Sequence, residues 1–111
     1  MIRPTFAQID LNVLKANYRI LQQFVSASGN PCPSVMAVVK ANAYGHGLVS
    51  VAKALEDVGA TMLACADIEE GVELREGGVR IPILVFGALS VSDLNGVFDY
   101  ELTPTVSSPS A

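Results

Sequence analysis

Short apolar segments alternate with amphipathic helical patterns along almost the whole chain, at intervals of roughly 20 to 26 residues. The apolar segments predict strands near residues 35–40, 61–66, 82–86 and 102–106. This alternation is typical of repeated βα units, in which a helix follows and covers each parallel strand. It is compatible both with part of a barrel and with a small doubly wound sheet, since both begin with the same units.

The helical patterns have recognisable ends. Asp10 is expected to cap the first helix, and Gly29 and Gly59 are expected to end the first and second. Asp67, with Glu70 three residues later, forms a predicted capping box for the third helix. The predicted helices cover residues 11–27, 48–58 and 67–78, and a further short one that opens at Ser92 or Asp93.

The first predicted strand carries five consecutive apolar residues, 35–39, and ends in Lys40. A strand whose side chains are apolar on both of its faces is typical of a parallel sheet that is covered on both faces. Ligands bind outside the carboxyl ends of such strands, so Lys40 is a candidate site residue. The alternative is that Lys40 carries its ammonium into water while its stem packs on apolar neighbours.

The residues after Lys40 favour a binding site. Gly45 and Gly47 permit backbone conformations that other residues resist, and a helix is predicted to open at Leu48. A helix N-terminus near glycines suits an anion such as phosphate. Tyr44 offers a phenolic donor to that anion, with plain packing as its alternative role. The pattern therefore places an amine beside an anion site.

The segment VVKANAYGHG, residues 38–47, resembles the pyridoxal-phosphate lysine motif of bacterial alanine racemases. Residues 7–18, 66–75, 81–87 and 102–106 resemble successive segments of the same family, so the resemblance extends from about Phe6 to about Val106. It implies a (β/α)8 barrel of the TIM type that binds pyridoxal 5'-phosphate, followed by a β-rich C-terminal domain, in a homodimer.

The length limits how much of that barrel the chain holds. A complete barrel takes roughly 250 residues, and 111 residues are under half of that. We therefore expect an α/β chain with about four strands, the N-terminal part of a truncated barrel. A partial domain over residues 1–106 and a disordered tail over residues 107–111 are predicted.

The resemblance implies that Lys40 is the catalytic lysine that binds the cofactor as a Schiff base, and that Tyr44 is a phosphate ligand. It implies interconversion of L- and D-alanine for peptidoglycan precursor supply. In the family the second proton donor is a tyrosine from the C-terminal part of the partner subunit, so turnover is expected to need the full-length enzyme. The alternatives are a non-catalytic pyridoxal-phosphate-binding module and an inactive truncated product.

Composition narrows the function classes. The net charge of −4 and the 16% of charged residues provide no basic surface for nucleic acid. No apolar run approaches the roughly 18 residues of a membrane span, and the N-terminus lacks the apolar core of a secretory signal, so a cytoplasmic protein is expected. The two cysteines, Cys32 and Cys65, and the sole histidine, His46, have no metal-ligand spacing, so no metal site is expected.

Overall fold

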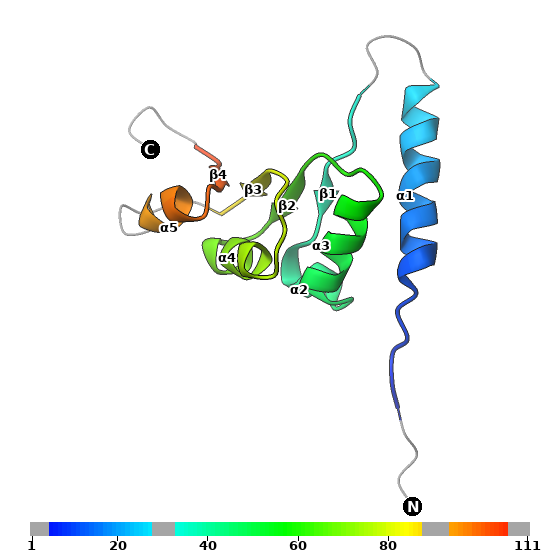
Figure 1. Ribbon diagram of the computed structural model, residues 1–111, viewed down its shortest axis with the longest axis horizontal. Coiled ribbons are helices and arrows are strands. Elements are labelled where there is room, and N and C mark those ends of the chain that lie inside the picture. Colours follow the sequence, from blue (N-terminus) through cyan, green and yellow to red (C-terminus); the bar gives the residue numbers. More distant parts are fainter. Residues whose placement is uncertain (1–4, 28–32, 88–93, 107–111) are drawn as a thin grey trace, which may run out of the picture.

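Four short strands form one parallel sheet in the order β1-β2-β3-β4. The computed structural model describes residues 5–27, 33–87 and 94–106. The strands are β1 (Ala37–Val38), β2 (Leu63–Cys65), β3 (Ile83–Val85) and β4 (Thr103–Pro104), and they follow one another in chain order across the molecule (Figure 1). A doubly wound sheet reverses its strand order, whereas this one does not. The barrel-type expectation is therefore confirmed over the described residues.

The helices form a continuous layer. They are α1 (Leu11–Ser26), α2 (Lys40–Tyr44), α3 (Leu48–Asp57), α4 (Ile68–Glu76) and α5 (Leu94–Asp99). Helix α3 packs against α1 and α4, and α4 also packs against α5. Right-handed connections between strands in sequential order place the intervening helices on the same face of the sheet. In Figure 1, α1 stands beside α3, next to the β1 end of the sheet.

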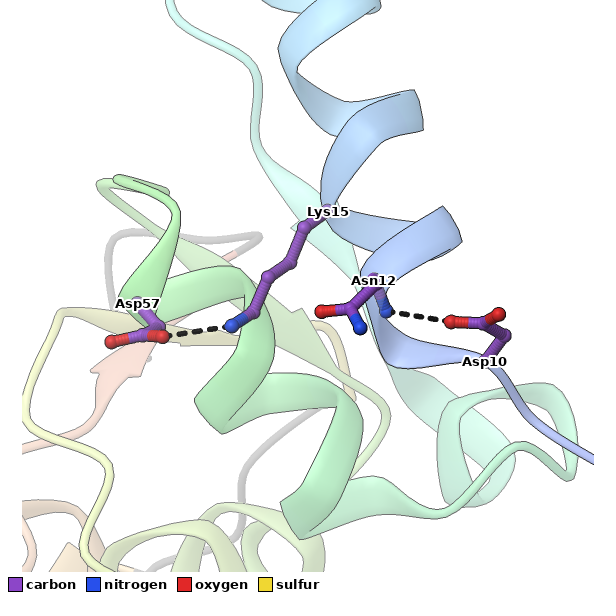
Figure 2. Close-up of polar contacts among 4 residues, drawn as sticks. All are labelled: Asp10, Asn12, Lys15 and Asp57. Carbon is purple, nitrogen blue, oxygen red and sulfur yellow. Dashed lines mark hydrogen bonds and ion pairs between the residues drawn. The ribbon is translucent and has the colours of Figure 1, made fainter.

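Two predicted helix caps are confirmed. Asp10 Oδ1 accepts hydrogen bonds from the backbone N–H groups of Asn12 (3.0 Å) and Val13 (3.2 Å), and Figure 2 shows the first of these. Asp67 Oδ1 accepts from the N–H of Glu70 (2.9 Å), but the returning half of the predicted capping box is wrong, since Glu70 Oε1 accepts from the N–H of Ala66 and not from that of Asp67. Each cap satisfies a backbone donor that the first turn of a helix leaves unpaired, which is why these two helices begin where the sequence predicts.

The predicted first strand is too long at both ends. Residues 35–40 were expected to be extended, but β1 contains only two residues and Lys40 already belongs to α2. Several other expectations concern residues outside the described ranges: the helix stop at Gly29, the environment of Cys32, the helix start at Ser92 or Asp93, and the tail over 107–111.

The two faces of the sheet differ in burial. One face points toward the helices and forms the core, where Leu63, Cys65 and Ile83 are completely buried. The other face carries a row of residues aligned by the strand register: Val38, Ala64, Leu84 and Thr103. In this row Val38 is 37% exposed, although the small Ala64 in the central strand is covered. The sheet is therefore covered by helices on one face and open on the other.

Within the described ranges, no helix is both long and apolar enough to cross a membrane.

Candidate functional site

Lys40 lies at the carboxyl edge of the sheet, on its open face. The register pairs Val38 with Ala64 and Ala64 with Leu84, and Lys40, Ala66 and Phe86 each follow shortly after the end of their strand, at the same edge of the sheet. The Nζ atom of Lys40 is 6.0 Å from the centroid of the Phe86 ring, within the range of a cation–π contact. Ala66, at the end of the intervening strand, has only a methyl group and leaves room for that contact. Phe86 is the site residue that the sequence reasoning missed.

The turn after Lys40 is left-handed. Ala41, Asn42 and Ala43 have φ between 53° and 56° and ψ between 43° and 51°, and Tyr44 has φ of 55°. This region costs an L-amino acid roughly 1–2 kcal/mol per residue, because Cβ approaches the following carbonyl oxygen. Four consecutive residues of this kind are strained, and backbone strain concentrates at functional sites. The sequence predicted a turn here, but not its hand.

Side chains of the motif support the strained turn. Asn42 Oδ1 accepts a hydrogen bond from the N–H of Leu48 (2.9 Å), and so caps α3. The methyl group of Ala43 is buried, and the backbone N–H of Ala43 donates to Val39 O (2.8 Å). The Nδ1 atom of His46 lies 3.1 Å from Ala43 O, where its N–H form donates. Asn42 and His46 therefore shape the turn.

The predicted anion site is only partly open. Helix α3 begins at Leu48 as expected, and Gly47 before it has φ of 100°. The N–H of Leu48, however, is already bonded to Asn42. Tyr44 is 59% exposed, and its hydroxyl makes no hydrogen bond with any other described residue. The structure thus brings Lys40 and Tyr44 onto one turn, with the amine and the hydroxyl accessible to a ligand.

An apolar cavity of about 370 Å³ lies between α1, β1 and α3. Tyr44 and His46 contribute to its wall, but Lys40 does not. The wall also includes Val38, two residues before Lys40, so the cavity lies close to the turn without being lined by the lysine.

The buried thiol of Cys65 is unreactive. Burial raises the pKa of the Cys65 thiol to about 12, with the nearby carboxylates of Glu70 and Asp67 acting in the same direction. This thiol therefore stays protonated and is a core side chain. Among residues 5–27, 33–87 and 94–106, no group of three or more His, Cys, Asp and Glu side chains is arranged to hold a metal ion.

Residues 9–111 match the family model described as "Alanine racemase, N-terminal domain". Alanine racemase from Halothermothrix orenii is 45% identical over 104 residues, which are 94% of this chain and 26% of that protein. Alanine racemase from Symbiobacterium thermophilum is 48% identical over 96 residues, 86% of this chain and 24% of that protein. The chain thus spans about a quarter of the length of the curated relatives it matches.

Solved structures show the same similarity. Alanine racemase from Bacillus anthracis with bound L-Ala-P superposes with a TM-score of 0.79 at 34% identity, covering 94% of this chain and 27% of that one. Alanine racemase from the D-cycloserine producing Streptomyces lavendulae gives a TM-score of 0.80 at 35% identity, covering 90% of this chain and 25% of that one. Sequence and backbone therefore agree over most of the chain.

Proposed function

Because this chain belongs to the alanine racemase N-terminal domain family, we propose that it serves a pyridoxal 5'-phosphate-dependent racemase that interconverts L- and D-alanine. The observation that carries the proposal is the accessible amine of Lys40, at the carboxyl edge of a barrel-type sheet, on a strained turn and beside an aromatic ring. Carboxyl edges of barrel strands are where TIM-barrel active sites lie.

The residues present fit the cofactor. Pyridoxal 5'-phosphate carries an aldehyde, an aromatic ring and a phosphate, and when bound it supplies an electron sink for the carbanion at Cα. Lys40 offers the amine that takes the aldehyde, and Tyr44 offers a hydroxyl donor for the phosphate. Phe86 offers an apolar ring beside the amine. We assign Lys40 as the catalytic and cofactor-binding residue, and Tyr44 as a cofactor-binding residue.

In this proposal the Nζ atom of Lys40, when not bonded to the cofactor, would remove or return the α-proton on one face of the substrate. Racemisation needs a second proton donor on the opposite face, and the corresponding tyrosine is expected from the partner of a homodimer. The proposed setting is cytoplasmic, and the D-alanine produced would supply peptidoglycan precursors.

The first test is covalent attachment of pyridoxal phosphate to the chain, trapped with borohydride and mapped by mass spectrometry. The chain offers an internal comparison, since it has three lysines, Lys15, Lys40 and Lys53. Lys15 is paired with Asp57, and Lys53 donates to Gly77 O. Lys40 makes no ion pair with any described residue. We expect label at Lys40 in preference to the other two, with loss of that label in Lys40→Ala.

Racemisation of L-alanine is measured in the same samples. Label at Lys40 without turnover is expected if this region binds the cofactor but lacks the second proton donor, and adding the remaining part of a full-length racemase should then restore activity. Equal label on all three lysines would contradict the proposal, because it would mean that the amine of Lys40 has no special environment. Lys53→Ala is the matched control and should leave the label at Lys40 unchanged.

A further inference from the structure

The left-handed turn after Lys40 is attached to the rest of the molecule through the carboxylate of Glu70. Oε2 of Glu70 accepts a hydrogen bond from the N–H of Asn42 (3.4 Å), at the centre of the turn. Oε1 accepts from the N–H of Ala66 (2.7 Å), at the end of β2. One side chain in the first turn of α4 therefore joins the ends of the first two strands.

These two backbone groups have particular positions. Asn42 lies in the strained turn that carries Lys40 at its start. Ala66 directly follows β2, the strand between those that precede Lys40 and Phe86. The bond to Ala66 also differs from an ordinary capping box, in which the acidic side chain returns to the N–H of the cap residue itself, here Asp67. The carboxylate instead reaches one residue further back, where its second oxygen can meet the turn.

We propose that Glu70 is a positioning residue for Lys40, holding the left-handed turn against the end of β2 so that the amine keeps its place beside Phe86. A strained conformation persists only when its surroundings over-determine it, and Glu70 supplies a contact from outside the motif. A carboxylate suits this position because both of its oxygens accept hydrogen bonds, and because negative charge is favourable at a helix N-terminus. A role of Glu70 in catalysis rests on the proposed function, whereas its role in holding the turn does not.

Two substitutions separate the contacts of Glu70. Glu70→Gln keeps one oxygen, which can still accept a hydrogen bond from the N–H of Ala66. Its NH2 group faces the N–H of Asn42 and cannot accept a hydrogen bond from it. Glu70→Ala removes both acceptors. Glu69→Gln is the matched control, since Glu69 also lies in the first turn of α4, is exposed, and makes no hydrogen bond with the described residues.

Amide hydrogen exchange in the absence of cofactor is the primary measurement. We expect exchange at Asn42 to become roughly tenfold faster in both Glu70 variants, and exchange at Ala66 to become faster only in Glu70→Ala. Glu69→Gln should stay within about twofold of the unchanged chain. Unchanged exchange at Asn42 in both variants would overturn the proposal. So would equal acceleration at all protected amides of α1 and α3, since that means global destabilisation.

The second measurement connects the turn to Lys40. At a temperature where all variants are folded by circular dichroism, we expect Glu70→Gln to slow cofactor attachment at Lys40 by roughly tenfold, with Glu69→Gln unchanged. An unaltered attachment rate in Glu70→Gln, despite faster exchange at Asn42, would overturn the positioning role. If the unchanged chain shows no attachment, the proposed function fails, and hydrogen exchange still decides whether Glu70 holds the turn.

Discussion

Arg75 joins several separate segments at the end of the sheet opposite Lys40. It donates hydrogen bonds to four backbone carbonyl groups, those of Val79, Ile81, Tyr100 and Glu101. A guanidinium presents five N–H donors in a fixed planar fork, which lysine does not. The half-buried Arg75 therefore connects the end of α4 with the loops that lead into β3 and β4.

Replacing Arg75 with Met is expected to lower the free energy of unfolding by about 2 kcal/mol, because carbonyl groups lose a charged donor and some of them are poorly accessible to water. Urea denaturation followed by circular dichroism measures this. Arg80→Met is the control, since it removes the same charge from an exposed side chain with no hydrogen bond to the described residues. Equal effects of the two substitutions would mean that only net charge matters.

A substitution at Ala41 tests whether the turn after Lys40 is left-handed. It is exposed and has φ of 53°, so its methyl group adds backbone strain without contributing to the core. Glycine adopts this conformation freely, and the relief exceeds the extra entropy that glycine loses on folding. We expect Ala41→Gly to raise the free energy of unfolding by up to about 1 kcal/mol.

Ala16→Gly provides the opposite control, because Ala16 is exposed in the right-handed helix α1. Glycine in a helix interior costs about 1 kcal/mol relative to alanine. The two substitutions are therefore expected to change the urea midpoint in opposite directions. A loss of stability in both would show that the turn is not left-handed in solution.

Only some features of the candidate site could be predicted from the sequence. Lys40 and Tyr44 could be selected because a lysine at a strand end and a following glycine-rich turn have general chemical meaning. The left-handed conformation of the turn could not be predicted from the sequence, since neither Ala41 nor Ala43 has any local preference for positive φ. Its conformation is stabilised by hydrogen bonds that the side chains of Asn42 and Glu70 accept, and the approach of Phe86 to Lys40 depends on the pairing of strands that are far apart in the sequence.

At the scale of elements, α1 is tied to α3 by the ion pair between Lys15 Nζ and Asp57 Oδ2, 2.8 Å apart (Figure 2). The hydrogen bond from Lys15, together with its positive charge, lowers the pKa of Asp57 below its ordinary value of 3.8. A depressed carboxyl pKa gives stability that is present above the ordinary value and is lost as the pH falls through the lower folded value.

Lys15→Met should therefore lower the urea midpoint at pH 7 by a small amount, because the pair is exposed to solvent. The difference from the unchanged chain should shrink as the pH falls below 3.8. Lys53→Met is the control, since Lys53 donates to the carbonyl group of Gly77, which does not titrate in this range. A Lys15→Met difference that stays constant with pH would contradict the assigned pairing.

Helices were more predictable than strands, for a physical reason. Asp10 and Asp67 cap their helices by local hydrogen bonds within three residues, which the sequence displays directly. Strand lengths depend on ladder bonds to neighbours far along the chain. β1 ends at Val38 because Val39 and Lys40 already turn toward α2, although their apolar and charged pattern alone would continue the strand.

At the scale of the whole molecule, strand order settles what the βα pattern left open. The parallel pairs β1–β2, β2–β3 and β3–β4 give a sheet that grows in one direction. Periodicity within a single βα unit cannot specify on which side the next unit is added, so the sequence alone could not distinguish the two architectures without the family resemblance. The open face of the sheet follows from this order.

That open face predicts self-association of the 111-residue polypeptide. Met36 and Phe86 are each 42% exposed, Val38 is 37% exposed, and among the described residues nothing pairs with the outer edges of β1 and β4. Exposed apolar surface and unpaired strand edges favour contact between chains. We expect sedimentation velocity to show association that grows with protein concentration.

Val38→Lys tests which surface is responsible, because it places a charge on the open face and at the edge strand, where lysine opposes strand pairing. Val13→Lys is its control, since Val13 is 54% exposed but lies on α1, away from the sheet. We expect the first substitution to shift the sedimentation profile toward monomer and the second to leave it unchanged. If both act equally, general hydrophobicity causes the association; if only Val13→Lys acts, the exposed face of α1 is the contact surface and the sheet face is not.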